Sequence, residues 1–355
     1  MQRFLVNQTQ ITDTRLEEVS SKALRAGEAR LRVNSFALTA NNVTYAASGF
    51  AIGYWKFFPT GVEGQGIVPV WGTAEVVETR SDLLPLGTRL YGYYPMAEEL
   101  IVMPKDDGHG VIVDAAQHRA DLPAVYNQYV PLRASGPDQE HTRALLQPLL
   151  ATSYLLFDWL MDNASFGAEQ IIVGSASSKT GLGLCKFLAE PEAREYRIIG
   201  LTSERNKAFV EGLNACDQVM TYDAVRDIPK RASVYVDMSG NAAVKQDLHE
   251  TLGDHLKHSS AVGISHWDQF KTKLELAGPK PEFFFAPGQI AKRRKEWGPG
   301  EIEGRISSAW KRLAEDASEW MDVKVHHGLS TAPQIYQALA DGTANPREGH
   351  IIDLT

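Results

Sequence analysis

The sequence predicts an α/β protein of two domains, one rich in β-strands and one built on a doubly wound parallel sheet. At 355 residues the chain exceeds one ordinary core, and chains of this length commonly form about two domains. Short β-type runs alternate with turns up to about residue 135, whereas strands and helices alternate beyond residue 140. We therefore expect a β-rich domain over 1–140 and 321–355, and an α/β domain over 141–320.

The β-rich domain is predicted from short runs of apolar and β-branched residues bounded by turn residues. Its clearest candidate strands are 30–34, 73–78 and 100–103. After residue 142 apolar residues recur at helical spacing, which predicts a helix across the domain boundary. The last part of the chain predicts a long polar helix, a second helix and a closing strand, at 301–320, 332–340 and 350–354.

The α/β domain carries six candidate strands separated by helical segments. These strands are 170–173, 196–201, 218–221, 234–237, 260–263 and 282–285. Strand and helix in alternation predict right-handed βαβ units and therefore a parallel sheet. Six parallel strands in two βαβαβ halves are the Rossmann arrangement that binds dinucleotides.

A run of small residues at 174–183 joins the first strand of this domain to its first helix. Such a loop lets backbone N–H groups approach an anion at the helix N-terminus. Serine stands where the G-x-G-x-x-G pattern has glycine, but Gly181 remains where helix and strand must pack closely. The alternative is an ordinary turn rich in serine and glycine. We expect this loop to bind cofactor phosphates through Ser177, Ser178, Lys179, Thr180 and Gly181.

The residues after the second strand favour NADPH over NADH. NAD-preferring folds carry an acidic side chain about 20 residues past the loop, whereas Thr202 and Ser203 stand here and leave room for a 2′-phosphate. Arg205 and Lys207 follow, where cationic groups would neutralise that phosphate. Glu204 keeps the NAD alternative open, because its carboxylate is near enough in sequence to reach a ribose hydroxyl.

Charge and cysteine content exclude several classes of function. A net charge of −8 opposes binding to nucleic acid or to an anionic membrane, and the basic run at 292–295 is interpreted as a solvated surface segment. No stretch reaches the ~18 apolar residues of a membrane span. The two cysteines, Cys185 and Cys216, form no metal-binding pair, so we expect no metal site and a cytoplasmic protein.

Several segments, taken in order, resemble motifs of one enzyme superfamily; they are 41–49, 71–78, 86–92, 94–102, 150–154, 237–240 and 349–354. The chain thus resembles the zinc-independent quinone oxidoreductase and enoyl reductase branch of the medium-chain dehydrogenase/reductase superfamily. It also resembles an uncharacterised bacterial family of reductase-like proteins. Val43 and Ala47 replace the usual Asp and Arg of the segment that lines the nicotinamide pocket in that superfamily.

The resemblance implies a GroES-like catalytic domain beside a Rossmann NADP-binding domain, and a homodimer. It implies zinc-free hydride transfer from NADPH to a small carbonyl or activated alkene, such as a quinone, an enone or an enoyl thioester. The alternative is a catalytically silent regulatory or scaffold protein that binds a nucleotide. Beyond the residues named above, the implied cofactor contacts are Thr152, Tyr222, Ser239 and Gly263.

Metal-free hydride transfer needs a hydrogen-bond donor near the developing enolate or alkoxide. Tyr45 is the first candidate for this donor, the alternative being a packed tyrosine on a loop. Asn41 and Asn42 are candidates for orienting the carboxamide or a substrate carbonyl, or else they form a turn. The aromatic segments 54–59 and 283–285 are candidate walls of an apolar substrate slot, with core packing favoured for Phe284.

Overall fold

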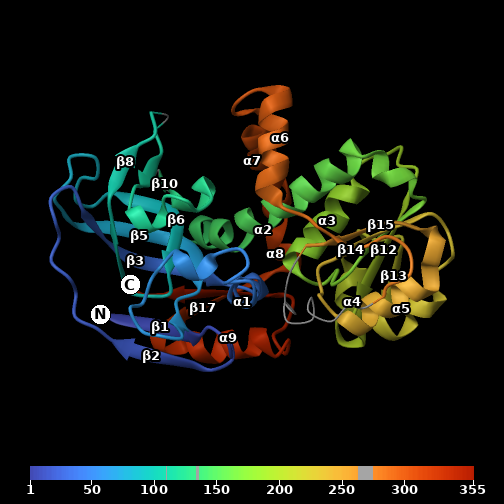
Figure 1. Ribbon diagram of the computed structural model, residues 1–355, viewed down its shortest axis with the longest axis horizontal. Coiled ribbons are helices and arrows are strands. Elements are labelled where there is room, and N and C mark those ends of the chain that lie inside the picture. The colour runs from blue at the N-terminus through green and yellow to red at the C-terminus, as the bar shows by residue number, and fades with distance from the viewer. Residues whose placement is uncertain (109, 133–135, 263–274) are drawn as a thin grey trace. The chain divides into compact units, whose positions relative to one another are not determined.

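The computed structural model describes residues 1–108, 110–132, 136–262 and 275–355, and Figure 1 shows its elements. The chain divides into two compact units. The first comprises Met1–Leu145 with Met321–Thr355, and the second comprises Leu146–Trp320. The first unit is built mainly of strands and the second alternates strands with helices, so the predicted α/β fold class is confirmed.

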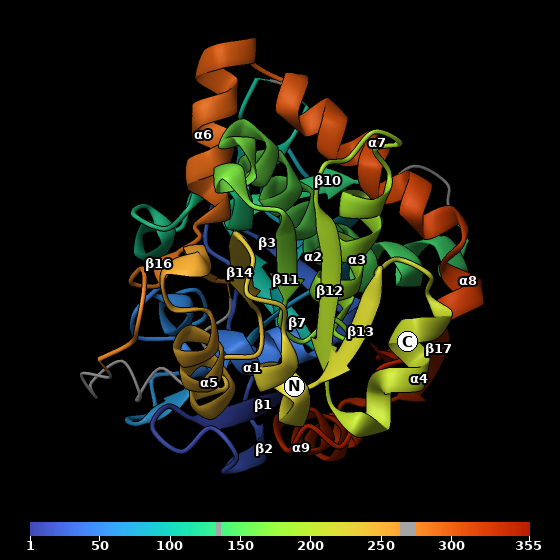
Figure 2. The same cartoon turned by 90° about the vertical axis from the view of Figure 1, so that its right-hand side faces the viewer.

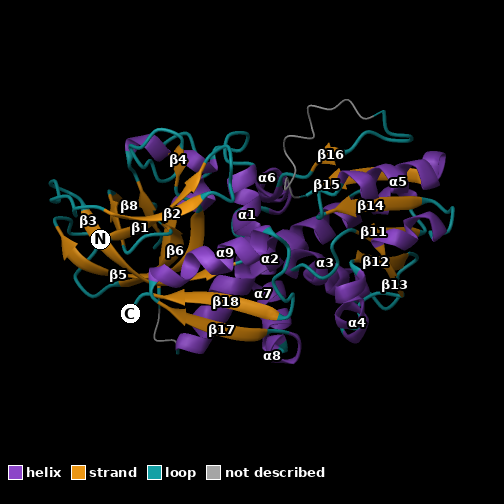
Figure 3. Cartoon of the chain, turned by 90° about the horizontal axis from the view of Figure 1, so that it is seen from below, coloured by secondary structure: helices purple, strands orange, loops and turns teal. Residues whose placement is uncertain are grey.

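The first unit contains two sheets (Figure 3). The smaller sheet has the order β2–β1–β4. The larger sheet has the order β17–β18–β3–β5–β6–β10–β9–β8, with β7 paired to β3. The strands are β1 (Gln2–Asn7), β2 (Thr14–Glu18), β3 (Ala29–Leu38), β4 (Gln65–Gly66), β5 (Pro69–Thr79), β6 (Arg89–Pro95), β7 (Glu99–Val102), β8 (Pro104–Asp106), β9 (Ile112–Asp114), β10 (Gln128–Pro131), β17 (Asp322–His327) and β18 (Glu348–Asp353).

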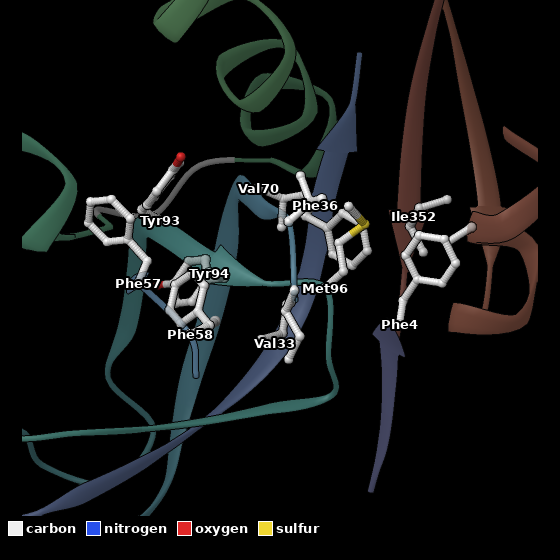
Figure 4. Close-up of a cluster of buried hydrophobic side chains, with 14 of the residues drawn as sticks. Phe4, Val33, Phe36, Phe57, Phe58, Val70, Tyr93, Tyr94, Met96 and Ile352 are labelled. Atoms are coloured by element: carbon white, nitrogen blue, oxygen red, sulfur yellow. The ribbon is translucent and has the colours of Figure 1, made fainter. Parts of the chain in front are cut away.

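The core of the first unit draws on residues from both ends of the chain. Figure 4 shows Phe4 of β1 beside Ile352 of β18, with Val33 and Phe36 of β3 nearby. The closing strand β18 pairs antiparallel with β3 and parallel with β17. The helices of this unit are α1 (Ala40–Ala47) and α9 (Ala332–Ala340), which pack against each other. The segment 321–355 therefore completes the sheet that residues 29–38 begin.

The second unit is built on a parallel sheet with the order β13–β12–β11–β14–β15–β16, which confirms the six parallel strands predicted in two βαβαβ halves. The last two strands differ from prediction: β15 ends at Ala261 and β16 spans only two residues. The strands are β11 (Gln170–Val173), β12 (Arg197–Thr202), β13 (Gln218–Thr221), β14 (Ser233–Asp237), β15 (Leu256–Ala261) and β16 (Glu282–Phe283).

Both faces of this sheet are covered (Figure 2). Ile171 and Val173 of β11 join the core formed with α2 and α3, whereas Ile172 joins the core on the opposite face with α5. This is why the central strand is a continuous apolar run rather than an alternating one. The helices are α2 (Pro137–Asp162), α3 (Lys179–Ala189), α4 (Glu204–Gly212), α5 (Ala242–Leu252), α6 (Ala286–Trp297), α7 (Glu301–Glu315) and α8 (Ala317–Trp320).

Helix α2 alone, in the part of the chain that the structure describes, is long and apolar enough to cross a membrane by length and composition. In its most apolar window 56% of the residues are buried inside the protein. The core helix of a soluble protein has the same composition, so the apolar character of α2 is accounted for by packing.

The basic run at 292–295 lies in α6 and corrects one prediction. Arg293 is buried, and its Nε lies 2.7 Å from Asp158 Oδ2 in α2. Lys292 pairs with Asp162, and Arg294 pairs with Glu303 of α7. Lys292, Arg294 and Lys295 are exposed, as predicted for a surface segment, so the correction concerns the burial of Arg293 alone. The predicted long helix at 301–320 is also two helices, α7 and α8.

Candidate functional site

The loop after β11 turns tightly into the first turn of α3. Ser178 is the N-cap of α3: its Oγ accepts a hydrogen bond from Gly181 N at 3.1 Å and donates one to Ser175 O at 2.8 Å. Ser175 adopts a φ of 56°, a left-handed conformation that non-glycine residues seldom adopt. A Cβ on Gly181 would lie 2.3 Å from Ser175 O, so only glycine fits there. The loop therefore holds the N-terminus of α3 at the carboxyl edge of the sheet, where parallel sheets bind phosphates.

A hydroxyl and an amide from the next connection hold Ser177 in this loop. Its Oγ accepts hydrogen bonds from Thr202 Oγ1 at 3.1 Å and from Asn206 Nδ2 at 3.2 Å. Thr202 is fully buried at the end of β12, and Asn206 lies in the first turns of α4. Sequence reasoning missed Asn206, although its position between Arg205 and Lys207 was a usable signal. The structure thus joins the β11–α3 and β12–α4 loops through polar side chains.

The predicted cationic residues lie at the start of α4. Ser203 is its N-cap and Glu204 its first residue. Arg205 is exposed, and Lys207 is half-buried with its Nζ 3.8 Å from Glu211 Oε1. Helix N-termini favour anions, and two cations in the same turns strengthen that preference. The local electrostatics therefore suit a phosphate group.

Tyr222 and Ser239 follow the next strands along the same edge of the sheet. Burial raises the pKa of Tyr222, and hydrogen bonding to Ser175 opposes that rise, so the phenol lies against the β11–α3 loop. Ser239 Oγ donates to Asp237 Oδ1 at 2.8 Å, and the backbone N–H groups of Ser239 and Gly240 donate to the same oxygen. The predicted D-x-x-G segment is thus a turn built around a buried carboxylate.

Two further predicted contacts have different outcomes. Thr152 Oγ1 donates to Pro148 O within α2, at 3.1 Å. Its neighbour Ser153, which sequence reasoning missed, donates to Thr180 O at 2.8 Å and so joins α2 to the first turn of α3. Gly263 lies outside the described residues.

In the first unit, the predicted catalytic residues lie in helix α1, so the alternatives of a turn for Asn41 and Asn42 and of a loop for Tyr45 are wrong, although Tyr45 is packed as its alternative supposed. Asn42 Oδ1 accepts from Thr39 N at 2.8 Å, and its Nδ2 donates to Pro69 O at 2.9 Å. Both ends of this amide bind the backbone, so Asn42 caps the helix and is engaged by the protein itself. Asn41 is half-buried, lies one helical turn before Tyr45 in α1 and opposes the rise of the Tyr45 pKa.

Tyr45 is buried among aromatic rings. Its ring centroid lies 4.3 Å from that of Tyr54 and 5.9 Å from that of Tyr93. Burial raises the pKa of Tyr45 well above its ordinary value, while the polar groups of Trp71, Asn41 and Tyr93 oppose the rise. This phenol therefore stays protonated at neutral pH, as a proton or hydrogen-bond donor must.

The two predicted aromatic walls behave differently. The segment 54–59 packs in the core of the first unit, with buried rings at Tyr54, Trp55, Phe57 and Phe58. In the second unit, Phe283 and Phe285 are 43% and 45% exposed and line a pocket of about 240 Å³ with Trp159. Phe284 is buried, as predicted.

The fold of the chain is similar to that of several solved oxidoreductases. Solved structures similar over the full chain include CurA from Vibrio vulnificus in complex with NADPH, at 11% identity and a TM-score of 0.63, covering 100% of this chain and 99% of that one. The yhdH oxidoreductase from Salmonella enterica in complex with NADP matches at 15% and 0.55, covering 100% of both chains. The quinone oxidoreductase from Coxiella burnetii matches at 16% and 0.54, covering 100% and 99%.

These similarities confirm the predicted resemblance to the medium-chain dehydrogenase/reductase superfamily at the level of the fold. The chain belongs to the family described as "Protein of unknown function (DUF2855)", whose model matches residues 36–345. No curated protein matches the chain in sequence.

Proposed function

We propose that this protein is an NADPH-dependent oxidoreductase that reduces a small carbonyl or activated alkene. The observation that carries the proposal is the tight turn from β11 into α3, where Gly181 admits no side chain and Ser178 caps the helix. Two proteins of similar fold are described in complex with NADPH or NADP. When bound, NADPH would supply the hydride; the chain's own residues must bind it and orient the substrate.

The residues at the carboxyl edge of the sheet fit a phosphorylated dinucleotide. Backbone N–H groups of the β11–α3 loop would hold the pyrophosphate, apart from those of Ser178 and Gly181, which donate to Ser175 O and Ser178 Oγ. Thr152, Ser239 and Gly263 would contact the remainder of the cofactor. Thr202 and Ser203 put no carboxylate at the end of β12, and the exposed Glu204 lies in the first turn of α4. Arg205, Lys207 and Tyr222 would hold the 2′-phosphate.

On the substrate side, Tyr45 would donate a proton or hydrogen bond to the enolate or alkoxide that forms. Its high pKa keeps the proton in place until an oxyanion or carbanion develops. Asn41, one helical turn before Tyr45 in α1, would orient it. No zinc is needed in this scheme, and residues 1–145 contain no cysteine to hold one. Quinones, enones and enoyl thioesters are the substrate classes that suit this chemistry.

The test is calorimetric titration with NADPH and with NADH, followed by NADPH oxidation with a panel of enones and quinones. We expect NADPH to bind more tightly than NADH and at least one acceptor to be reduced. Tight NADPH binding without turnover would instead favour the second candidate, a nucleotide-binding regulatory protein. Failure to bind either nucleotide would overturn the cofactor assignment.

We also propose that the protein is a cytoplasmic homodimer formed through β16. This strand is the last in the sheet order of the described residues, and Phe283 within it is exposed beside Phe285. Exposed edges with apolar side chains favour pairing with a second chain. Sedimentation velocity should show a dimer for the natural protein and a monomer for Phe283→Glu; an unchanged mass would contradict this interface.

A further inference from the structure

The register of β5 and β6 brings three aromatic side chains with polar ends to one face of the sheet. Trp71 of β5 pairs with Tyr93 of β6, and Tyr91 lies two residues earlier on the same strand. Residues two apart on a strand share a face. The rings confirm this arrangement: the Trp71 centroid lies 5.0 Å from that of Tyr93 and 5.7 Å from that of Tyr91.

The polar atoms of these side chains are buried and unsatisfied within the described residues. Trp71 Nε1 and the hydroxyls of Tyr91 and Tyr93 have no partner there in normal hydrogen-bond geometry. Nearby tyrosines are satisfied: Tyr54 and Tyr126 share a hydrogen bond of 3.3 Å, and Tyr129 donates to Tyr93 O. Burying several donors without acceptors on one face is costly and calls for an explanation.

Two of these donors lie beside the proposed proton donor. The Tyr93 ring centroid lies 5.9 Å from that of Tyr45 and 5.0 Å from that of Trp71, and the polar groups of Trp71 and Tyr93 oppose the rise of the Tyr45 pKa. Figure 4 shows the hydroxyl of Tyr93 directed away from Phe57 and the other apolar side chains drawn around it. The indole N–H of Trp71 thus lies near the phenols of Tyr45 and Tyr93, and burial keeps both phenols protonated.

We propose that Trp71 and Tyr93 bind the carbonyl oxygen of the substrate beside Tyr45, and that the substrate is a conjugated carbonyl compound. This inference rests on the proposed reductase function. When an enone or quinone accepts hydride at carbon, negative charge collects on its oxygen. Neutral donors fixed in a site that excludes water stabilise such an oxyanion strongly. An acceptor without a carbonyl oxygen would leave both donors unsatisfied.

The first test uses 4-nitrophenolate as a mimic of the enolate, because its absorbance reports binding without turnover. We expect the natural protein, with NADP⁺ present, to bind the probe, and Trp71→Phe and Tyr93→Phe each to bind it about tenfold more weakly. Tyr336→Phe is the matched control, since its hydroxyl is also buried and without a partner among the described residues but lies in α9. The control should bind the probe as the natural protein does.

Unchanged probe affinity in both variants, or no binding by the natural protein, would overturn the inference. The second test is turnover with an enone, in which Tyr93→Phe should lower kcat more than it raises KM. An active natural protein with unaffected variants would overturn this inference and leave the reductase function intact. An inactive natural protein with the expected pattern of probe binding would retain the oxyanion site and contradict the reductase function.

Discussion

The two units place their polar groups in opposite ways. At the carboxyl edge of the second unit's sheet, hydroxyls and amides bind one another: Ser178 caps α3, and Ser177 accepts from Thr202 and Asn206. On the β5–β6 face of the first unit, the buried donors of Trp71 and Tyr93 have no acceptor among the residues that the structure describes. The second unit thus offers a ligand a loop whose backbone conformation is fixed. The first unit offers side-chain donors that have no acceptor among the described residues.

The backbone-based site should be the easier one to destroy, by Gly181→Ala. The new Cβ would meet Ser175 O, a backbone atom that cannot move away, so we expect NADPH affinity to fall at least about a hundredfold and unfolding free energy to fall by about 1–3 kcal/mol. Calorimetry and urea unfolding measure both effects. Gly212→Ala is the control, because its Cβ would meet nothing within 4 Å. Equal behaviour of the two variants would show that the loop does not depend on this close approach.

A substitution at the proposed substrate site of the first unit should change the turnover rate and leave cofactor affinity unchanged. Tyr45→Phe is expected to lower kcat by about a hundredfold, the usual contribution of a general acid, with NADPH affinity nearly unchanged. Stopped-flow turnover and calorimetry separate the two. A parallel loss of NADPH affinity would mean that Tyr45 supports the cofactor instead.

The pH dependence of kcat tests the same role of Tyr45 as a proton donor. Burial raises the pKa of Tyr45, so the phenol keeps its proton at every pH below that raised pKa. It ionises only when the pH exceeds that value. We therefore expect no fall in kcat from Tyr45 ionisation between about pH 7 and pH 10, where an exposed tyrosine would begin to titrate. A decline in kcat over this range that Tyr45→Phe abolishes would contradict the assignment.

Lys207→Ala tests whether the positive charge at the start of α4 makes the protein prefer NADPH over NADH. We expect NADPH affinity to fall about tenfold and NADH affinity to stay within about twofold, because only the 2′-phosphate loses a cation. Lys311→Ala in α7 is the control, an exposed lysine outside the proposed site. Equal losses for both nucleotides would count against the 2′-phosphate role.

Asn206→Ala should have the smallest effect. Ser177 keeps its bond from Thr202, so we expect a loss of about 1 kcal/mol in unfolding free energy and a few-fold weaker NADPH binding. Urea unfolding and calorimetry provide the values. No change in either would show that the link between the two loops is dispensable.

The sequence predicted most of the fold because its signals are local. Helix α9 begins and ends at the residues that its apolar period predicted, and all six strands of the parallel sheet lie at or near their predicted segments. The features that the sequence did not predict depend on residues that are distant along the chain. Arg293 lies in a basic run that reads as solvated, but Asp158, 135 residues away, binds it in the interior. Likewise, Ser153 and Asn206 are ordinary helix residues until the fold brings them to the β11–α3 loop.

The pairing of β18 with β3 has a consequence for synthesis. During translation all residues of the second unit have been added once Trp320 is made, and its sheet uses only residues from within that unit. The large sheet of the first unit must wait for residues 348–353, with the Ala37 edge of β3 unpaired until Ile351 arrives. An exposed strand edge promotes aggregation, so we expect the nascent chain to aggregate most readily after β3 has been made and before β18 pairs with it.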